Sequence, residues 1–166
     1  MENHTHQKEA LQSVKERIKE VRIAILTTIS TDGRLHSRPM ATNEMDSDGA
    51  LWFFTNESSA KVDEINRKNV VSLSYSDPAN NTYVCLAGEA ELVTDHGKME
   101  ELFNPLVKAW FPKGLDDPDL ALLKVTPQEA EYWDSSSSKM VTAFNILKAL
   151  VTGTKHHEDE HGKVTL

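Results

Sequence analysis

Short runs of residues that favour β-strands follow one another through the first half of the chain, and turn sequences join them. Thr31-Asp32-Gly33 separates an extended run at residues 22–30 from a second run at 35–45. Asp46-Ser47-Asp48-Gly49 then leads into a third, very apolar run at 50–55. Glycine accepts the positive φ that tight hairpin turns need. Neighbouring runs are therefore predicted to pair as antiparallel hairpins.

Four more strands are predicted farther along the chain, at residues 70–76, 82–93, 120–125 and 129–133. In the first of them Val71, Leu73 and Tyr75 alternate with serines, which is the period of a half-buried strand. Gly88 lies inside the second strand and indicates a bulge or a bend. The last two strands are predicted to be separate because Thr126-Pro127 lies between them.

Helical periodicity marks both ends of the chain and two segments between the strands. Apolar residues recur every three or four positions in the first helix, at Leu11, Val14, Ile18 and Val21. A second helix is predicted within residues 56–68 with Ser58 or Ser59 as its cap, and one short helix after Thr94 or Asp95. A C-terminal helix is outlined by Met140, Phe144, Leu147 and Val151. About seven strands with flanking helices indicate the α+β class, and strands of this number in a small domain curl into a barrel.

The chain has the length of one ordinary domain, 166 residues. We expect a flexible N-terminus at 1–7, a single domain at 8–152 and a charged flexible C-terminal tail at 153–166. A net charge of −8 disfavours nucleic-acid binding. No apolar run is long enough for a membrane span, and we expect no membrane contact. The single cysteine, Cys85, cannot form an intramolecular disulfide, and together these features favour the cytoplasm.

The segment at residues 53–61 combines the features of a phosphate site. An apolar strand ends at Phe54 and Thr55, serines turn the chain, and a helix begins with Lys61 in its first turn. Helix starts present unpaired N–H groups and a partial positive charge, and a lysine adds a full charge there. The alternative interpretation is structural: Ser58 or Ser59 only caps the helix, and Lys61 is solvated.

A second unusual segment has a proline inside an extended run, at Arg38-Pro39-Met40. Proline removes a hydrogen bond from a strand, so it is tolerated at an edge, at a bulge or where the backbone faces something other than a strand. Arg38 could pair with an anion. The alternative is an edge strand with a solvent-exposed arginine.

Most histidines lie near the two ends of the chain, and His156-His157 and His161 belong to a charged segment. These residue types can bind metals, but a charged tail explains them equally, and we predict no metal site. His36 and His96 have no Cys or His partner at metal-site spacing. No nucleophile motif, Walker loop or dinucleotide-binding glycine motif occurs, so no catalytic residue is nominated.

Several short motifs occur in a characteristic order between about residue 8 and about residue 150. In chain order they are Ser37-Arg38-Pro39-Met40, Phe54-Thr55-Asn56, Ser58-Ser59-Ala60-Lys61, Gly88-Glu89-Ala90, Trp110-Phe111-Pro112-Lys113-Gly114-Leu115 and Glu131-Tyr132-Trp133. With this order and spacing the chain resembles the pyridoxamine 5'-phosphate oxidase-like flavoproteins. Among them it is similar to the general stress protein 26 branch.

The resemblance implies a mostly antiparallel split β-barrel that forms a homodimer, with FMN bound at the subunit interface. FAD or a deazaflavin would be alternative cofactors. By the resemblance, the cofactor-binding residues are Arg38, Pro39, Met40 and Ala41 along the flavin, Phe54 and Thr55 at a strand end, Ser59 and Lys61 at the phosphate, and Tyr83 and Trp133 near the ring. It does not decide which subunit supplies each contact.

Two departures from the family pattern affect the expected function. Many oxidases of the family have an arginine just before the phosphate lysine, where this chain has Ala60. The vitamin B6 oxidases also end with an arginine and histidine segment, which residues 162–166 do not match, so oxidation of vitamin B6 phosphates is not expected. The resemblance therefore implies an FMN-dependent oxidoreductase of unknown small-molecule substrate. The alternative is a non-catalytic flavin-binding stress protein that stores or senses flavin.

Overall fold

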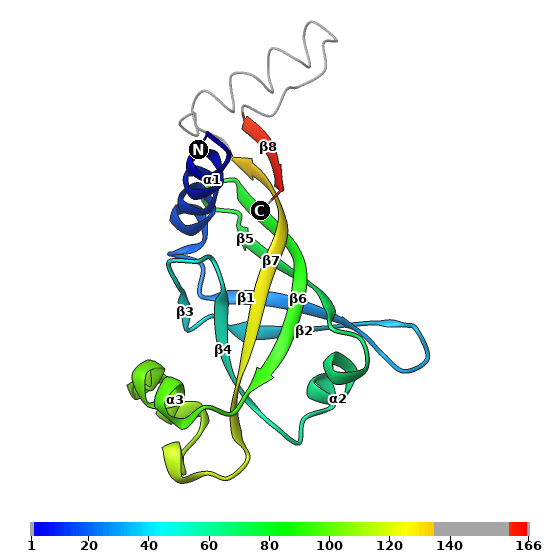
Figure 1. The fold of residues 1–166 in the computed structure, drawn as a ribbon, viewed down its shortest axis with the longest axis vertical. Coiled ribbons are helices and arrows are strands. Elements are labelled where there is room, and N and C mark those ends of the chain that lie inside the picture. Colours follow the sequence, from blue (N-terminus) through cyan, green and yellow to red (C-terminus); the bar gives the residue numbers. More distant parts are fainter. Residues whose placement is uncertain (1, 135–159, 166) are drawn as a thin grey trace, which may run out of the picture.

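A curled antiparallel sheet forms the body of the protein in a computed structural model that describes residues 2–134 and 160–165 (Figure 1). Its strands are β1 (Ile23–Ile29), β2 (Leu35–Ala41), β3 (Glu44–Met45), β4 (Leu51–Asn56), β5 (Val70–Asp77), β6 (Thr82–Val93), β7 (Leu120–Asp134) and β8 (Glu160–Thr165). The helices are α1 (Glu2–Ile18), α2 (Ala60–Arg67), α3 (His96–Leu102) and α4 (Pro105–Trp110), with a short 3₁₀ turn at Gly114–Asp116. The predicted α+β class is confirmed.

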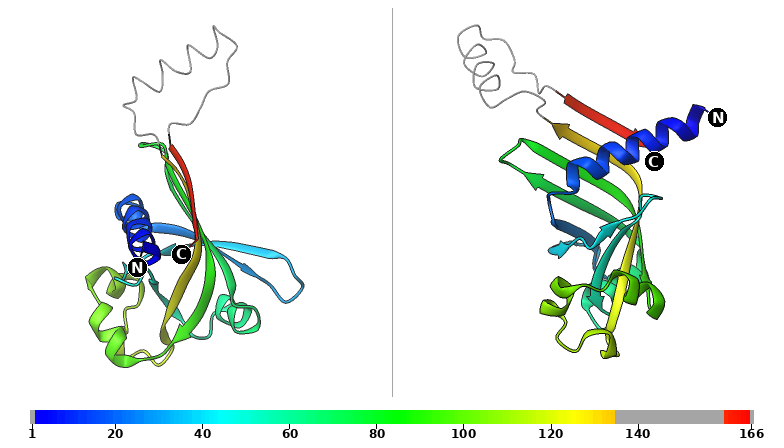
Figure 2. Two further views of the ribbon diagram at one scale, coloured as in Figure 1. Left: turned by 45° about the horizontal axis from the view of Figure 1, so that its top comes forward. Right: turned by 90° about the vertical axis from the view of Figure 1, so that its left-hand side faces the viewer.

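The strands are ordered β2-β1-β5-β6-β7-β4-β3, so β2 lies at one end of the sheet, and β8 pairs with the outer half of β7. The hairpin of β1 and β2 runs across the direction of β6 and β7, which reflects the strong twist of the sheet (Figures 1 and 2). Gly33 and Gly49 have φ of 79° and 89° in the first two turns, as the hairpin prediction requires. This half-barrel is the split-barrel fold, and one edge of β2 is paired with none of the strands that the structure describes.

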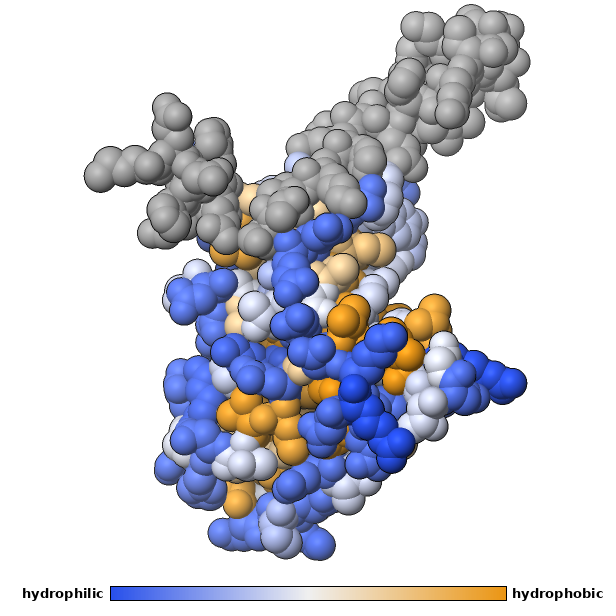
Figure 3. Space-filling view, turned by 45° about the vertical axis from the view of Figure 1, so that its right-hand side comes forward, coloured by the Kyte–Doolittle hydropathy of each residue, from blue (hydrophilic) through white to orange (hydrophobic). Residues whose placement is uncertain are grey.

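One face of the sheet remains exposed. Along β1 the side chains of Ala24, Leu26 and Thr28 are buried, whereas Ile23 and Ile25 on the opposite face are 49% and 42% exposed. The strand register places further exposed apolar residues on the same face, namely Leu35, Val70 and Tyr83. Figure 3 shows apolar surface on one side of the molecule, bordered by hydrophilic side chains.

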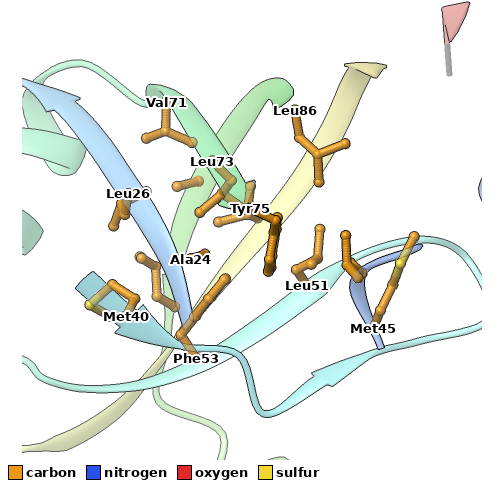
Figure 4. Close-up of a cluster of buried hydrophobic side chains, with 14 of the residues drawn as sticks. Ala24, Leu26, Met40, Met45, Leu51, Phe53, Val71, Leu73, Tyr75 and Leu86 are labelled. Carbon is orange, nitrogen blue, oxygen red and sulfur yellow. The ribbon is translucent and has the colours of Figure 1, made fainter. Parts of the chain in front are cut away.

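The concave face carries the main core (Figure 4). Leu26, Leu73 and Phe53 have no exposed surface there, and α1 covers them in part with Val14 and Ile18. Full burial of one such side chain contributes about 1.5–3 kcal/mol. The stripe of the first predicted helix is thus confirmed as a core-facing stripe.

A second cluster explains why the third predicted strand is so apolar. In β4 the side chains from Leu51 to Thr55 are all buried, because α3 and α4 cover the face that turns away from the main core. Phe54 packs edge-on against Phe103, with ring centroids 6.0 Å apart. A strand buried on both faces reads as a continuous apolar run.

The prediction of two separate last strands is wrong. β7 is continuous through Thr126 and Pro127, and its register with β6 shifts between Ala87 and Gly88. A side chain at Gly88 would place its Cβ 2.2 Å from the Thr126 carbonyl oxygen, so glycine permits this close approach. The bulge accommodates the proline that we expected to end the strand, and the predicted bulge at Gly88 is confirmed.

Other segments differ from the sequence prediction in local structure. The single helix predicted after Asp95 is two helices: α3 ends at Leu102 because Phe103 is extended, and Asn104 caps α4, whose first residue is Pro105. Part of the segment predicted as a tail forms β8, and α1 already begins at Glu2. The predicted C-terminal helix lies outside the described residues, and the domain boundaries stay a prediction. Within the described residues, no helix is long and apolar enough to cross a membrane.

Candidate functional site

A groove follows the seam where the curled sheet does not close, between β2 and β4. Its volume is about 1140 Å³, and β2, β4, α1, α4 and the start of α2 contribute to its walls. Six of the predicted cofactor residues line it: Pro39, Met40, Ala41, Phe54, Thr55 and Lys61. Among the described strands β2 pairs only with β1, so its other edge presents backbone groups that none of these strands satisfies. Pro39 therefore lies on an edge strand, which is one of the three settings in which a proline inside an extended run is tolerated.

The end of the groove near α2 gathers polar groups. Lys61 Nζ donates to Thr55 Oγ1 at 3.1 Å, and the Thr55 and Ser59 hydroxyl oxygens are 3.5 Å apart. Ser59 is the N-cap residue of α2, but its side chain makes no capping hydrogen bond. This differs from the structural interpretation of the sequence, in which a serine only caps the helix. The hydroxyl and the first N–H groups of α2 are thus available to an acceptor.

The electrostatics at this end favour an anion. Burial lowers the pKa of Lys61, the nearby Arg38 guanidinium lowers it further, and the Glu64 carboxylate opposes both by raising it. Lys61 forms no ion pair with any of residues 2–134. A half-buried ammonium group that makes no direct ion pair is stabilised by a bound anion, and the start of α2 adds its partial positive charge. These residues fit a phosphate group.

Arg38 is positioned by a buried carboxylate. Its guanidinium donates to Glu64 Oε2 at 2.8 Å and also to Thr28 Oγ1, and 22% of its side chain is exposed. The alternative of a solvent-exposed arginine is therefore wrong. Arg38 does not line the groove, so whether it contacts a cofactor, as the resemblance implies, stays a prediction.

Glu64 itself was missed by the sequence analysis. Its carboxylate also accepts from Thr28 Oγ1 at 2.5 Å and lies 2.6 Å from His36 Nδ1. Burial alone would raise its pKa, but hydrogen bonds from Thr28, His36 and Arg38 lower the pKa to about 2. The carboxylate is thus ionised at neutral pH, and it holds Arg38 beside the helix that carries Lys61. The available signal was its position three residues after Lys61, between the buried Val62 and Ile65.

Two asparagines, also missed, hold α4 against the groove. Asn104 Oδ1 accepts from the backbone N–H groups of Leu106 and Val107 at 3.0 and 3.2 Å, and thereby caps α4. Asn104 Nδ2 donates to Asn43 Oδ1 at 3.0 Å, which ties the cap to the strand connection after β2. α4 then presents Trp110 to the groove with 76% of its surface exposed.

The remaining predicted residues lie elsewhere. Tyr83 and Trp133 are direct partners across β6 and β7, and neither lines the groove. Tyr83 is 40% exposed on the open face of the sheet. Within the described residues, no three His, Cys, Asp or Glu side chains gather as a metal site would require. His156 and His157 lie outside that part of the chain.

Comparisons with known proteins agree with this architecture. The sequence model of the family described as "pyridoxamine 5'-phosphate oxidase like" matches residues 9–157. A general stress protein 26 from Jannaschia sp. CCS1 is 27% identical, with a TM-score of 0.74 and full coverage of both chains. A general stress FMN/FAD binding protein from Xanthomonas citri is 29% identical, with a TM-score of 0.68 over 79% of this chain and 92% of that one.

A curated relative extends the similarity to a fungus. Protein bli-3 of Neurospora crassa is 28% identical over 136 residues, which cover 76% of this chain. The match covers 65% of the length of that relative.

Proposed function

The chain belongs to the pyridoxamine 5'-phosphate oxidase-like family, and we propose that it binds FMN in the groove between β2 and β4. The observation that carries the proposal is the meeting of Lys61, the Thr55 and Ser59 hydroxyls and the uncapped start of α2 at one end of that groove. Each group donates hydrogen bonds or positive charge, which a phosphate dianion accepts. The Xanthomonas citri relative, described as binding FMN or FAD, supports the same proposal.

The rest of the groove suits a flat, largely apolar ring. Pro39, Met40 and Ala41 bring the free edge of β2 to it, and edge backbone groups can pair with the polar rim of a flavin. Phe54 supplies an apolar wall, held by its edge-on contact with Phe103. FAD or a deazaflavin could enter the same groove, with its additional groups extending past the phosphate.

We further propose a homodimer in which the flavin lies at the subunit interface. Tyr83 and Trp133 lie outside the groove of their own chain, so they reach a flavin only if a second copy supplies them. The exposed apolar face of β1, β2 and β5 offers a surface for that copy (Figure 3). Obligate dimer interfaces are rich in such apolar area.

The proposed activity is that of an FMN-dependent oxidoreductase, located in the cytoplasm, with a substrate still to be identified. FMN would supply the electron transfer, and the residues of the groove would bind and orient it. Anaerobic mixing of the FMN-loaded protein with NADH or NADPH should bleach the absorbance of the oxidised flavin. No reduction by these or by a panel of other donors would favour a flavin store instead.

Replacement of the lysine tests the phosphate site. A charge-assisted hydrogen bond contributes about 1.5–3 kcal/mol, so Lys61→Ala should weaken FMN binding by about tenfold to a hundredfold. Riboflavin, which has no phosphate, should bind the variant and the unmodified protein equally. Lys68→Ala, at the exposed far end of α2, is the matched control. Equal losses for FMN and riboflavin would contradict the assignment of Lys61.

A further inference from the structure

The groove continues past the flavin site to a second basic end. Its wall there is the C-terminal half of α1 and the segment that follows it, with Lys15, Ile18, Lys19 and Arg22 along the groove. Lys15 and Ile18 lie three residues apart within α1, Lys19 follows the last residue of the helix, and Arg22 lies just before β1; all four line the same groove. Ile18 is buried in the core, whereas the three basic residues are exposed. α1 and α2 are well separated in both ribbon figures, so this end is distinct from the one at Lys61.

The basic residues at this end are not engaged in ion pairs within the described part of the chain. Lys15, Lys19 and Arg22 are exposed, and none of them forms an ion pair with the other described residues. Two carboxylates, Glu44 and Asp46, also line the groove, against four cations that include Lys61. Without Lys61, which lies at the other end, three cations face these two carboxylates, so this end is net +1 in a chain whose net charge is −8. Such a reversal of sign concentrates anions in the groove.

Asp46, one of the two carboxylates that line the groove, is already engaged in hydrogen bonds with its own turn and the strand that follows. Asp46 Oδ1 accepts from the backbone N–H groups of Asp48 and Ala50 at 2.9 and 3.0 Å, and its Oδ2 accepts from Trp52 Nε1 at 3.0 Å. These bonds fix the turn before β4, so Asp46 is held by that turn and not by the lysines. The basic residues of α1 remain available to a ligand.

The opposite wall is apolar and exposed. On α4, Leu106 is 60% exposed and Trp110 is 76% exposed, although both side chains are large and apolar. The asparagine cap described above fixes this helix, so the wall is preformed. Exposed apolar surface beside unpaired cations suits a ligand that has an apolar body and an acidic group.

We propose that this end of the groove binds the anionic group of an organic substrate, a carboxylate or a phosphate, whose apolar body lies against α4. The inference rests on the proposed function, because the substrate would then lie beside the flavin. The two basic ends of the groove then bind different groups. Lys61 and the start of α2 bind the cofactor phosphate, and Lys15, Lys19 and Arg22 bind the anionic group of the substrate.

Titration calorimetry with simple probes tests the proposal. The FMN-loaded protein is titrated with benzoate, phenyl phosphate and uncharged benzamide. We expect the two anions to bind and benzamide to bind at least about tenfold more weakly, because it lacks the charge. The double variant Lys15→Glu/Lys19→Glu should lower the affinity for both anions by about tenfold or more. Lys68 is exposed and lies outside the groove, so Lys68→Glu should leave that affinity unchanged. Lys19→Arg keeps the charge and should retain binding.

Several results would overturn the inference. One is the absence of binding heat with both anions, and another is benzamide binding as tightly as the anions. A third is an equal loss of anion affinity in Lys15→Glu/Lys19→Glu, here called the α1 variant, and in Lys68→Glu. The last is anion binding that Lys61→Ala abolishes and the α1 variant retains. Thermal melts of each variant exclude unfolding as the cause. The α1 variant should still bind FMN like the unmodified protein. If FMN fails to bind any form, the proposed function fails, and benzoate titration of the flavin-free protein still tests the basic end.

Discussion

Replacement of Glu64 by glutamine tests the buried cluster that positions Arg38. The Glu64 side chain is 8% exposed, and its pKa falls from 4.5 to about 2 because Thr28, His36 and Arg38 bond to the ionised form. Each pKa unit corresponds to about 1.4 kcal/mol of preference for the charged form. The ionised carboxylate therefore stabilises the folded protein by roughly 3 kcal/mol at neutral pH.

The sign of the pH dependence follows from the lowered pKa. In the unfolded chain Glu64 binds a proton near its ordinary value of 4.5, and in the folded protein it does so only near 2. Its contribution is complete above about pH 5 and is lost as the pH falls toward about 2. Glutamine keeps the size and some hydrogen bonds of the side chain, so Glu64→Gln should cost about 2–3 kcal/mol at pH 7.

Urea unfolding at a series of pH values measures this contribution. At pH 7 the midpoint of Glu64→Gln should lie well below that of the unmodified protein, and the difference should shrink as the pH is lowered. Glu20→Gln, an exposed residue after α1, is the control and should change stability by less than about 0.5 kcal/mol. Equal stability of Glu64→Gln and the unmodified protein at pH 7 would refute the reasoning, and so would a deficit that does not diminish in acid.

Three further predictions concern single features of the fold and the site. Gly88→Ala places a methyl group 2.2 Å from the Thr126 carbonyl oxygen, a backbone atom, so chemical denaturation should reveal a loss of at least about 2 kcal/mol; near-native stability would mean that the bulge adapts. Ser59→Ala should alter stability by less than the roughly 1 kcal/mol typical of N-caps, because its hydroxyl makes no capping bond, but it should weaken FMN binding in a fluorescence titration; the opposite pattern would make Ser59 a cap only. Light scattering at low micromolar concentration should show a dimer that FMN strengthens, and a monomer that binds FMN tightly would remove Tyr83 and Trp133 from the site.

The hairpin order of the first strands could be predicted because the turn residues and the alternation are local signals. Gly33 and Gly49 indicate their turns within four residues of sequence. The continuity of β7 could not be predicted in the same way. Pro127 ends a strand unless the partner strand offers a glycine opposite it, and that partner, Gly88, is remote in sequence and is identified only by the register.

The residues of the candidate site likewise differ in whether a local sequence signal predicts them. Lys61 and Pro39 were found because a helix start and a proline in a strand are unusual by themselves. Glu64 was missed because its partners Arg38 and Thr28 lie 26 and 36 residues away, and only the fold brings them together. The basic face of α1 was missed for another reason: its spacing is also that of an ordinary solvated helix face.

Calorimetric titration of the purified protein with FMN tests flavin binding most directly, and an absorption spectrum of the same sample identifies any flavin already bound. Binding in the groove predicts saturation at one FMN per chain, with a rise in melting temperature when FMN is in excess. If FMN, FAD and a deazaflavin all give no binding heat and no rise in melting temperature, the proposed flavin binding is contradicted. The groove between β2 and β4 would then bind some other ligand.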